Sequence, residues 1–139
     1  MQRNKVQAQV RQEINYQGRD ERDLFELETE AVLTELTHYS KLSYQDQEGQ
    51  LVEVKWYPSG SPLANRVDIN SGQGLMCFDL SQTFQRDYLT PAGPLPLEFR
   101  AQSLAWELDE AHNRLHIQYQ ILSQEELLGN YDYELIFYS

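Results

Sequence analysis

The sequence predicts an all-β protein built as a single antiparallel up-and-down barrel of about 8–10 strands. Apolar residues recur at every second position in most segments, and turn signals separate these segments at intervals of about 8 to 15 residues. Nearly every segment has one apolar and one polar face, which favours one sheet rolled up on itself over a sheet covered by helices. With 139 residues and 40% hydrophobic content, we expect one domain, residues 1–139, with one core.

The first two predicted strands form a hairpin around residue 20. In the first strand, polar side chains alternate with a stripe of inward residues that only Gln12 interrupts: Val6, Ala8, Val10, Ile14 and Tyr16. Turn residues 17–23 include Gly18, which can adopt a positive φ. The second strand then places five residues inward: Phe25, Leu27, Thr29, Ala31 and Leu33. This pairing would bring Arg11 near Glu28 and Glu30 on the outer face.

Shorter strands follow in the middle of the chain, and two longer ones end it. The middle segments are residues 38–44, 51–57, 65–70 and 75–80, and the last two are 114–121 and 131–137. In each of the last two, apolar or aromatic residues alternate with polar ones, as in a half-buried strand. Residues 123–129, SQEELLG, are the best candidate for a single helical turn, and we interpret them as a connection.

A proline cluster interrupts this pattern between residues 86 and 100. Pro91 and Pro94 bracket Ala92-Gly93 and predict a change of chain direction. Pro96 has no N–H to donate, so it belongs at a strand start or edge. Further on, the apolar phase shifts by one residue near residues 102–103, which predicts a β-bulge where a long strand bends around a barrel corner.

The charge balance excludes two classes of partner. There are 11 basic and 22 acidic residues, a formal net charge of -11, whereas nucleic acids and anionic membranes attract cationic surfaces. No apolar run is long enough to span a bilayer, and the N-terminus lacks the apolar stretch of a secretory signal. The one cysteine, Cys77, cannot form an internal disulfide. We therefore expect a cytoplasmic protein without nucleic-acid or membrane partners.

Three places in the sequence carry a family resemblance: residues 88–93, YLTPAG, then Leu-Pro-Leu at 95–97, and the strand pair around 104–121. In these places it resembles the YwiB-like bacterial proteins. The resemblance extends over the whole chain in element order, and its most specific part is the Tyr-x-Thr-Pro-x-Gly turn. It implies a calycin-type β-barrel similar to lipocalins and fatty-acid-binding proteins, with no assigned biochemical role and no catalytic motif. Ala92 replaces an aromatic residue usual in relatives, and residues 70–72, Asn-Ser-Gly, lack a basic residue usual there.

The candidate catalytic and metal-binding residues have simpler interpretations. His38, His112 and His116 have no paired spacing or cysteine partner, so we interpret them as surface histidines and predict no metal or cofactor. The row Glu26, Glu28 and Glu30 shares one exposed face, which favours a solvated strand over acid–base chemistry. Cys77 has no neighbouring base or cation in sequence, so we expect it to pack in the interior. With no catalytic residues indicated, we do not expect the protein to be an enzyme.

Two functions remain open, and both depend on where the side chains point. Large inward residues alternating with small or polar ones fit a barrel that holds one small, mostly apolar ligand, oriented by tyrosine hydroxyls. The residues predicted to line this interior are Tyr16, Phe25, Phe99, Tyr119, Tyr133 and Phe137. The alternative is a filled barrel that serves as a protein-interaction or homodimerisation module. Its docking patch would be formed by Leu24, Val32, Ile136 and Tyr138.

Overall fold

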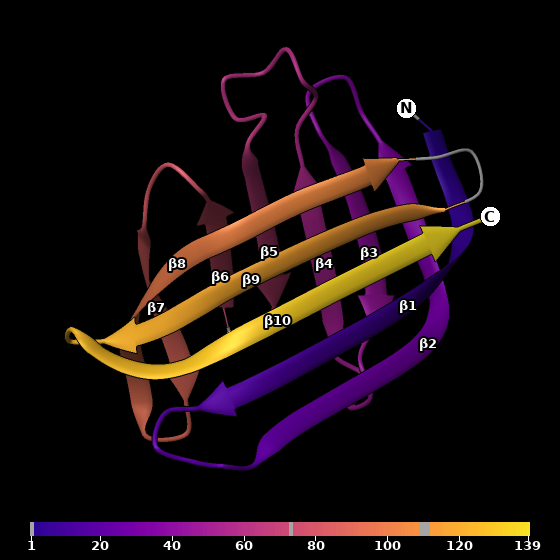
Figure 1. Ribbon diagram of the computed structural model, residues 1–139. Helices are drawn as coiled ribbons and strands as arrows, with labels where there is room; N and C mark the ends of the chain where they lie inside the picture. Colours follow the sequence, from indigo (N-terminus) through magenta and orange to yellow (C-terminus); the bar gives the residue numbers. More distant parts are fainter. Residues whose placement is uncertain (1, 73, 109–111) are drawn as a thin grey trace.

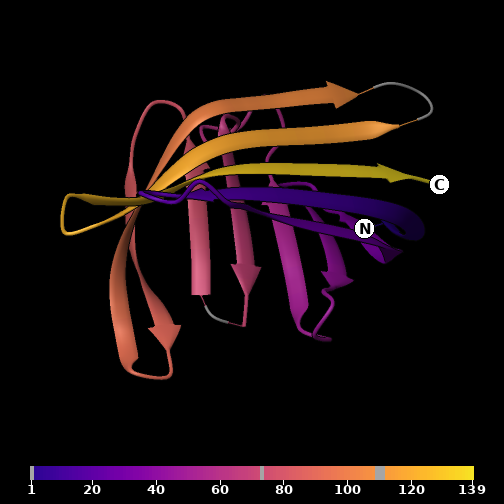
Figure 2. The ribbon, with the colours of Figure 1, turned by 60° about the horizontal axis from the view of Figure 1, so that its bottom comes forward.

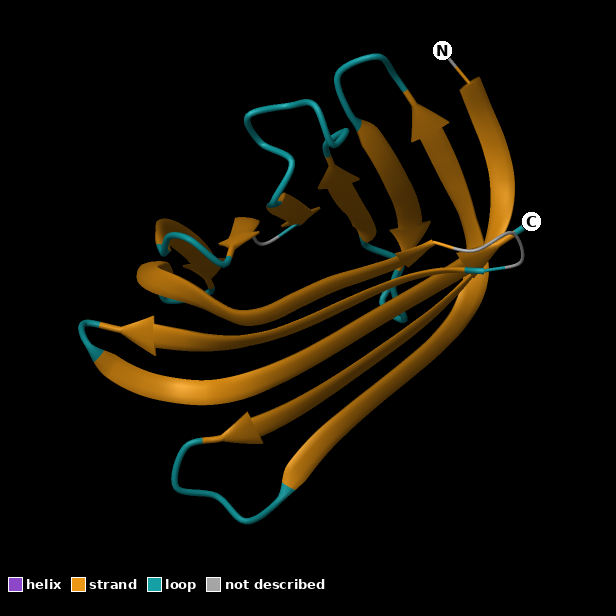
Figure 3. Ribbon diagram, turned by 45° about the horizontal axis from the view of Figure 1, so that its top comes forward, coloured by secondary structure: helices purple, strands orange, loops and turns teal. Residues whose placement is uncertain are grey.

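The computed structural model describes residues 2–72, 74–108 and 112–139, and within these ranges the chain forms strands, turns and loops and no helix (Figure 3). Ten strands follow one another: β1 (Gln2–Tyr16), β2 (Arg22–Glu35), β3 (Ser40–Gln45), β4 (Leu51–Trp56), β5 (Arg66–Ser71), β6 (Gly74–Asp79), β7 (Phe84–Thr90), β8 (Gly93–Leu108), β9 (Asn113–Ser123) and β10 (Glu126–Tyr138). The all-β prediction is confirmed.

All ten strands belong to one antiparallel sheet that runs β6-β5-β4-β3-β2-β1-β10-β9-β8-β7. Consecutive strands pair with one another, with the exception of β6 and β7, which form the two ends of the sheet and face each other. The first and last strands, β1 and β10, also pair. A Cβ added to Gly74 at the start of β6 would lie 3.3 Å from the Asp87 carbonyl oxygen of β7. The up-and-down barrel is therefore nearly closed, and its seam lies between β6 and β7.

The barrel is flattened into two layers that cross each other. The long strands β8, β9, β10 and β1 run side by side across the shorter strands β3, β4, β5 and β6 (Figure 1). Figure 2 shows the same two layers from a second direction, with the long strands extending over the short ones. The side chains between these layers form the core, and the polar faces of the strands point outward.

Strand β8 bends from one layer into the other, and the proline cluster lies at its start (Figure 2). Pro94 and Pro96 pair only with β7, because pairing with β9 begins at Glu98. The register with β9 shifts between Ala101 and Ser103. This is the predicted bulge, and it lets both halves of β8 present apolar residues to the interior. The prolines thus occupy a turn and a one-sided strand start, as predicted.

Two local predictions were wrong. The register of the β1–β2 hairpin places Arg11 opposite Glu26, not between Glu28 and Glu30, whose partners are Gln9 and Gln7. Residues 123–129 contain no helical turn in the structure. The connection predicted there is present but short, because β9 and β10 are joined at Gln124 and Glu125, whose φ angles are 51° and 69°. Two successive left-handed residues are typical of a tight hairpin turn, which aligns with the twist of the adjoining strands.

The half of the barrel away from the β1–β2 loop is filled with side chains. Trp56 of β4 contacts Trp106 and Phe137, with ring centroids 4.9 and 5.7 Å apart. In the middle, Phe78 packs edge-on against Phe99 at 6.0 Å. The aliphatic residues Leu42, Val54, Leu115, Ile117 and Leu135 are fully buried around these rings. This end of the barrel is a packed core with no room for a ligand.

Candidate ligand-binding cavity

The other half of the barrel holds an open-mouthed cavity of about 660 Å³ between the two layers. It opens at the end where the β1–β2 loop, the β3–β4 turn and the β5–β6 turn lie. The long-strand layer contributes Val10, Gln12, Ile14, Tyr16, Phe25, Leu27, Tyr119 and Tyr133. The short-strand side contributes Tyr44, Asp46, Gln47, Glu48, Gln50, Val52, Ile69, Ser71, Met76 and Tyr88. The volume and the mostly apolar lining are typical of small-molecule sites.

Strand alternation explains how β1 forms one wall of this cavity. Val10, Gln12, Ile14 and Tyr16 lie two residues apart, so all four side chains point to the same face of the sheet. The neighbouring β2 adds Leu27, which pairs with Val10, and Phe25, which pairs with Gln12. One short stretch of hairpin therefore supplies apolar surface, one amide and two aromatic rings.

Two hydrogen-bonded pairs form the polar part of the cavity. The Tyr44 and Tyr133 hydroxyls lie 3.0 Å apart, so a side chain of β3 contacts one of β10 across the two layers. The amide of Gln12 donates to the Tyr119 hydroxyl oxygen at 3.0 Å. Tyr119 is held in place by stacking on Tyr131, with ring centroids 5.1 Å apart. Each buried side-chain nitrogen or oxygen of the described residues has a hydrogen-bond partner.

Burial keeps these tyrosines neutral. Desolvation raises the pKa of Tyr44 to about 12, against the hydrogen bond with Tyr133, which lowers it. Desolvation also raises the pKa values of Tyr119 and Tyr133 far above the usual value, and it raises that of Tyr88. A neutral hydroxyl can orient a ligand by hydrogen bonds, but it cannot act as a base near neutral pH.

The β3–β4 turn places two carboxylates at the rim of the cavity. Asp46 is half-buried, and its Oδ1 accepts hydrogen bonds from the backbone N–H groups of Glu48 and Gln50, both at 2.9 Å. Glu48 is exposed at the tip of the turn. Gly49 completes the turn with φ 79°, a conformation that favours glycine. The carboxylate of Asp46 is thus fixed by the turn, whereas that of Glu48 is free to move.

The structure brings four of the six predicted interior residues together. Tyr16, Phe25, Tyr119 and Tyr133 all line the cavity. Phe25 lines the cavity at its rim, where its side chain is 45% exposed. Phe99 and Phe137 point inward but belong to the packed core, at 1% and 2% exposure. They therefore fill the barrel and do not line its hollow end.

Sequence reasoning missed several residues that line the cavity, although the alternating pattern of the strands indicates some of them. Gln12 interrupts an apolar stripe and is one of the polar residues expected to point inward, but its hydrogen bond to Tyr119 was not predicted. Tyr44 lies two residues after the buried Leu42, so alternation places it inward. Met76 and Tyr88 line the cavity from β6 and β7. Their contribution depends on how the seam closes, which no local pattern indicates.

Cys77 is buried in a polar cluster on the opposite side of the short-strand layer from this cavity. Its Sγ lies 3.3 Å from the Arg66 guanidinium, which also contacts Asp68 at 2.7 Å. Tyr57 donates to the other oxygen of Asp68 at 2.8 Å. Burial raises the pKa of the Cys77 thiol, and the Asp68 carboxylate raises it further. The thiol therefore stays protonated, which is the opposite of what a nucleophile requires.

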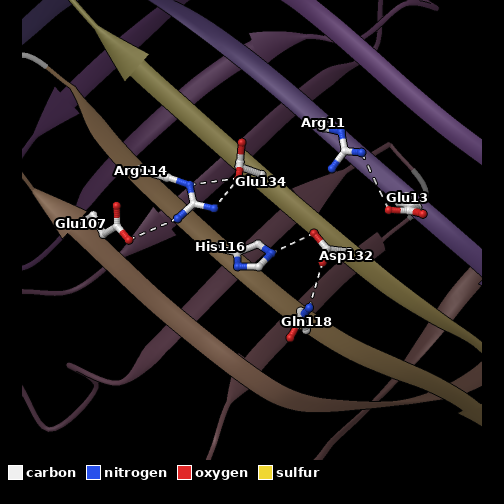
Figure 4. A network of polar contacts seen from close by, with 8 residues as sticks. All are labelled: Arg11, Glu13, Glu107, Arg114, His116, Gln118, Asp132 and Glu134. Atoms are coloured by element: carbon white, nitrogen blue, oxygen red, sulfur yellow. Dashed lines mark hydrogen bonds and ion pairs between the residues drawn. The ribbon is translucent and has the colours of Figure 1, made fainter.

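The outer face of the long strands forms a network of charged and polar contacts (Figure 4). His116 Nε2 lies 2.8 Å from Asp132, whose other oxygen accepts from Gln118 at 2.9 Å. Arg114 bridges Glu134 at 2.9 Å and Glu107 at 3.2 Å. Within the described part of the chain, no three His, Cys, Asp or Glu residues are arranged to hold a metal ion. This face is a solvated ion-pair surface.

Charged residues also separate two of the four apolar residues of the predicted docking patch, Leu24 and Val32. Leu24 pairs with Glu13 near one end of β2, and Val32 pairs with Lys5 near the other. The exposed residues Glu26, Glu28 and Glu30 lie between them on the same face. Ile136 and Tyr138 lie on β10, where their partners across β1 are Gln9 and Gln7.

These features define a class of protein: nearly closed, ten-stranded antiparallel β-barrels that are packed at one end and hollow at the other. The chain belongs to the DUF1934 family, a domain of unknown function whose model matches residues 8–135. Its fold is similar to the crystal structure of the ywiB protein from Bacillus subtilis. That match has a TM-score of 0.76 and 18% sequence identity, and covers 100% of this chain and 94% of the other. The YwiB-like resemblance is thereby confirmed.

No curated protein matches the sequence significantly. Among the described residues, no helix is long and apolar enough to cross a membrane.

Proposed function

We propose that this protein is a non-catalytic, cytoplasmic binding protein that holds a small, mostly apolar molecule in the open end of its barrel. The observation that supports this best is the contrast between the two halves of the interior. One half is packed with Trp56, Trp106 and Phe137, whereas the other half holds an open-mouthed cavity of about 660 Å³. Protein cores are normally close-packed, so a lined space of this size in a small domain calls for a ligand.

The lining residues suggest how such a ligand would be held. Burying its apolar surface against Val10, Leu27 and Ile69 would supply most of the affinity, at about 25 cal/mol per Å². The neutral hydroxyls of Tyr119 and Tyr133 would then orient its polar atoms. The YwiB-like resemblance implies a calycin-type barrel, and barrels of this type, such as lipocalins, can hold one small ligand in their interior.

The alternative function, a docking or dimerisation module, has less support. Its patch would need Leu24, Val32, Ile136 and Tyr138 to form one continuous apolar surface. The row of exposed glutamates on β2 separates two of these residues, and such a row opposes the approach of a second acidic chain.

A substitution that fills the cavity tests the proposed function. Leu27→Trp places an indole inside the cavity, whereas Leu24→Trp makes the same change on the same strand but on its outer face. We expect the neutral dye Nile red to bind wild type and Leu24→Trp alike, and to bind Leu27→Trp at least about tenfold more weakly. Native mass spectrometry of gently purified protein should also detect a bound small molecule in wild type.

A second filling variant guards against a folding defect. If Leu27→Trp loses its far-ultraviolet circular dichroism, Met76→Trp introduces the same group from the opposite side of the cavity. Equal dye binding by a folded filling variant and by wild type would overturn the cavity as the binding site. A wild-type protein that binds no dye and carries no small molecule would overturn the proposed function itself.

A further inference from the structure

The cavity has an uneven charge distribution that bears on which ligand it takes. Among the described residues that line it, there is no lysine, arginine or histidine, but there are two carboxylates, Asp46 and Glu48. Both belong to the β3–β4 turn, so the negative charge is confined to one side of the rim. Six lining residues carry aromatic rings: Tyr16, Phe25, Tyr44, Tyr88, Tyr119 and Tyr133.

We propose that the cavity selects protonated amines with an apolar body and discriminates against carboxylates such as fatty acids. This inference rests on the proposed function and adds the chemical class of the ligand. The apolar body would lie between the two layers, and the ammonium group would lie at the rim beside Asp46 and Glu48. Charge at the rim, and not shape alone, would set the specificity.

A bound carboxylate would have no cationic partner among these lining residues. An ion taken out of water without a compensating charge is strongly disfavoured, because it loses its hydration. The net charge of -11 adds a long-range repulsion. Arg19 is a cation next to the lining residue Tyr16, with its guanidinium 5.5 Å from the centre of the Tyr16 ring. However, the Asp23 carboxylate also acts on Tyr16. Burial raises the pKa of the Tyr16 hydroxyl most, and Asp23 raises it further.

A protonated amine would meet two favourable features at the same place. Asp46 is held by backbone N–H groups in an orientation that the turn fixes, so its charge is positioned before any ligand arrives. The rings of Tyr16 and Phe25 on the long-strand layer and of Tyr88 on the short-strand side also line the cavity, and aromatic faces attract ammonium groups within about 6 Å. Together these features favour a positive charge over a negative one.

The tyrosine hydroxyls do not reverse this preference. Tyr44 and Tyr133 bond to each other, and Tyr119 accepts from Gln12, which leaves its own hydrogen for an oxygen acceptor. These groups are neutral, so they can bind a hydroxyl or carbonyl oxygen at the inner end of a ligand. They cannot supply the full positive charge that a buried carboxylate requires.

A matched ligand series tests the proposal. Decylamine, decanol and decanoic acid share one alkyl chain, and their affinities can be measured by isothermal titration calorimetry at neutral pH, low salt and submicellar concentration. We expect the amine to bind best, and to bind at least about tenfold more tightly than the acid. We also expect added salt to weaken amine binding and to leave decanol binding unchanged.

Variants of the rim carboxylate link this preference to the site. Glu48→Gln should weaken amine binding roughly threefold without changing decanol binding, and Glu48→Lys should weaken it further and strengthen acid binding. Glu28→Gln is the control, because it removes the same charge from the outer face of β2.

The outcomes separate the two proposals. Equal affinity for all three ligands, or tightest binding of the acid, would overturn the selection for amines while leaving the cavity as a binding site. An equal effect of Glu48→Gln and Glu28→Gln would show that overall charge, not the rim, sets the preference, and would also overturn it. Failure of all three ligands to bind would overturn both proposals.

Discussion

At the scale of single residues, the contact between Tyr44 and Tyr133 joins the two layers directly. Each hydroxyl is buried and satisfied by the other at 3.0 Å. Tyr44→Phe or Tyr133→Phe alone should therefore lower the free energy of unfolding by about 1–3 kcal/mol, because the remaining hydroxyl loses its partner. The double variant should cost less than the sum of the single variants, since it leaves no unpaired hydroxyl. Urea unfolding of the four proteins measures this coupling.

The outcome of this double-mutant cycle has a clear alternative. Strictly additive costs would mean that each hydroxyl finds water or another partner, so that the bond between them contributes nothing of its own. In that case the pair would not hold the layers together at this end of the barrel. A coupling of at least about 0.5 kcal/mol is the minimum that supports the interpretation.

The sequence predicted the direction of most individual side chains but not their depth. Alternation correctly turned Tyr119 and Tyr133 inward, because each lies between polar neighbours on a long strand. The same alternation turned Phe25 inward, yet Phe25 is 45% exposed. It lies at the open end of the barrel, where no further layer of side chains covers it. A period of two reports the face of a strand and says nothing about distance from its end.

At the scale of strands, the approach of β1 and β10 near the cavity mouth depends on Gly129. A Cβ at this position would lie 3.0 Å from the Asn15 carbonyl oxygen and 3.5 Å from Tyr16 Cα. Both are backbone atoms, so they cannot move without shifting β1. We expect Gly129→Ala to lower the free energy of unfolding by about 1–3 kcal/mol, measured by urea or thermal unfolding.

Gly60 provides the matched control for this strand contact. A Cβ at Gly60 would meet no atom within 4 Å, and alanine restricts the unfolded chain more than glycine does. Gly60→Ala should therefore be neutral or slightly stabilising. If Gly129→Ala were equally neutral, the close approach of the two strands would not require glycine.

Strand-level features differed in how well the sequence could predict them. The bulge in β8 changes the phase of the apolar pattern, and proline can occupy only turns, strand starts or strand edges. Both features could therefore be predicted from the sequence. The hairpin turn at Gln124 and Glu125 was not, because both residues adopt positive φ angles without the Asn-Gly or Asp-Gly signature of such turns. The cross-strand partner of Arg11 was not predicted correctly either, since shifting the register by two residues leaves every inward side chain on the inner face.

At the scale of the whole molecule, the position of the seam and the presence of the cavity were beyond the sequence. The predicted up-and-down barrel implies that the first and last strands pair, but nothing in the strands themselves indicates that the gap falls between β6 and β7. Likewise, a filled and a half-hollow barrel can share one set of inward residues. How much space remains depends on the crossing of the two layers, which is set by sheet twist and by the bend in β8.

The buried tyrosines give the whole barrel a predictable response to alkaline pH. Below the ordinary tyrosine pKa of 10.0, folded and unfolded chains hold the same protons on these groups. Above it, the unfolded chain loses protons that Tyr44, Tyr119 and Tyr133 retain in the fold, because burial raises their pKa values. Unfolding then releases protons, so the free energy of unfolding falls as pH rises from 10 toward 12.

Each fully affected tyrosine contributes a slope of about 1.4 kcal/mol per pH unit, so these three together should give roughly 4 kcal/mol per unit. Tyrosinate absorbance, recorded with circular dichroism during an alkaline titration, should show these residues ionising only as the sheet unfolds. The Tyr44→Phe/Tyr133→Phe protein lacks two of these groups, so its slope should be shallower by about 2.8 kcal/mol per pH unit. If all nine tyrosines instead ionised near the ordinary value with the sheet intact, the hydroxyls would be open to water. The cavity would then be a hydrated channel, with no desolvated hydroxyls to orient an apolar ligand.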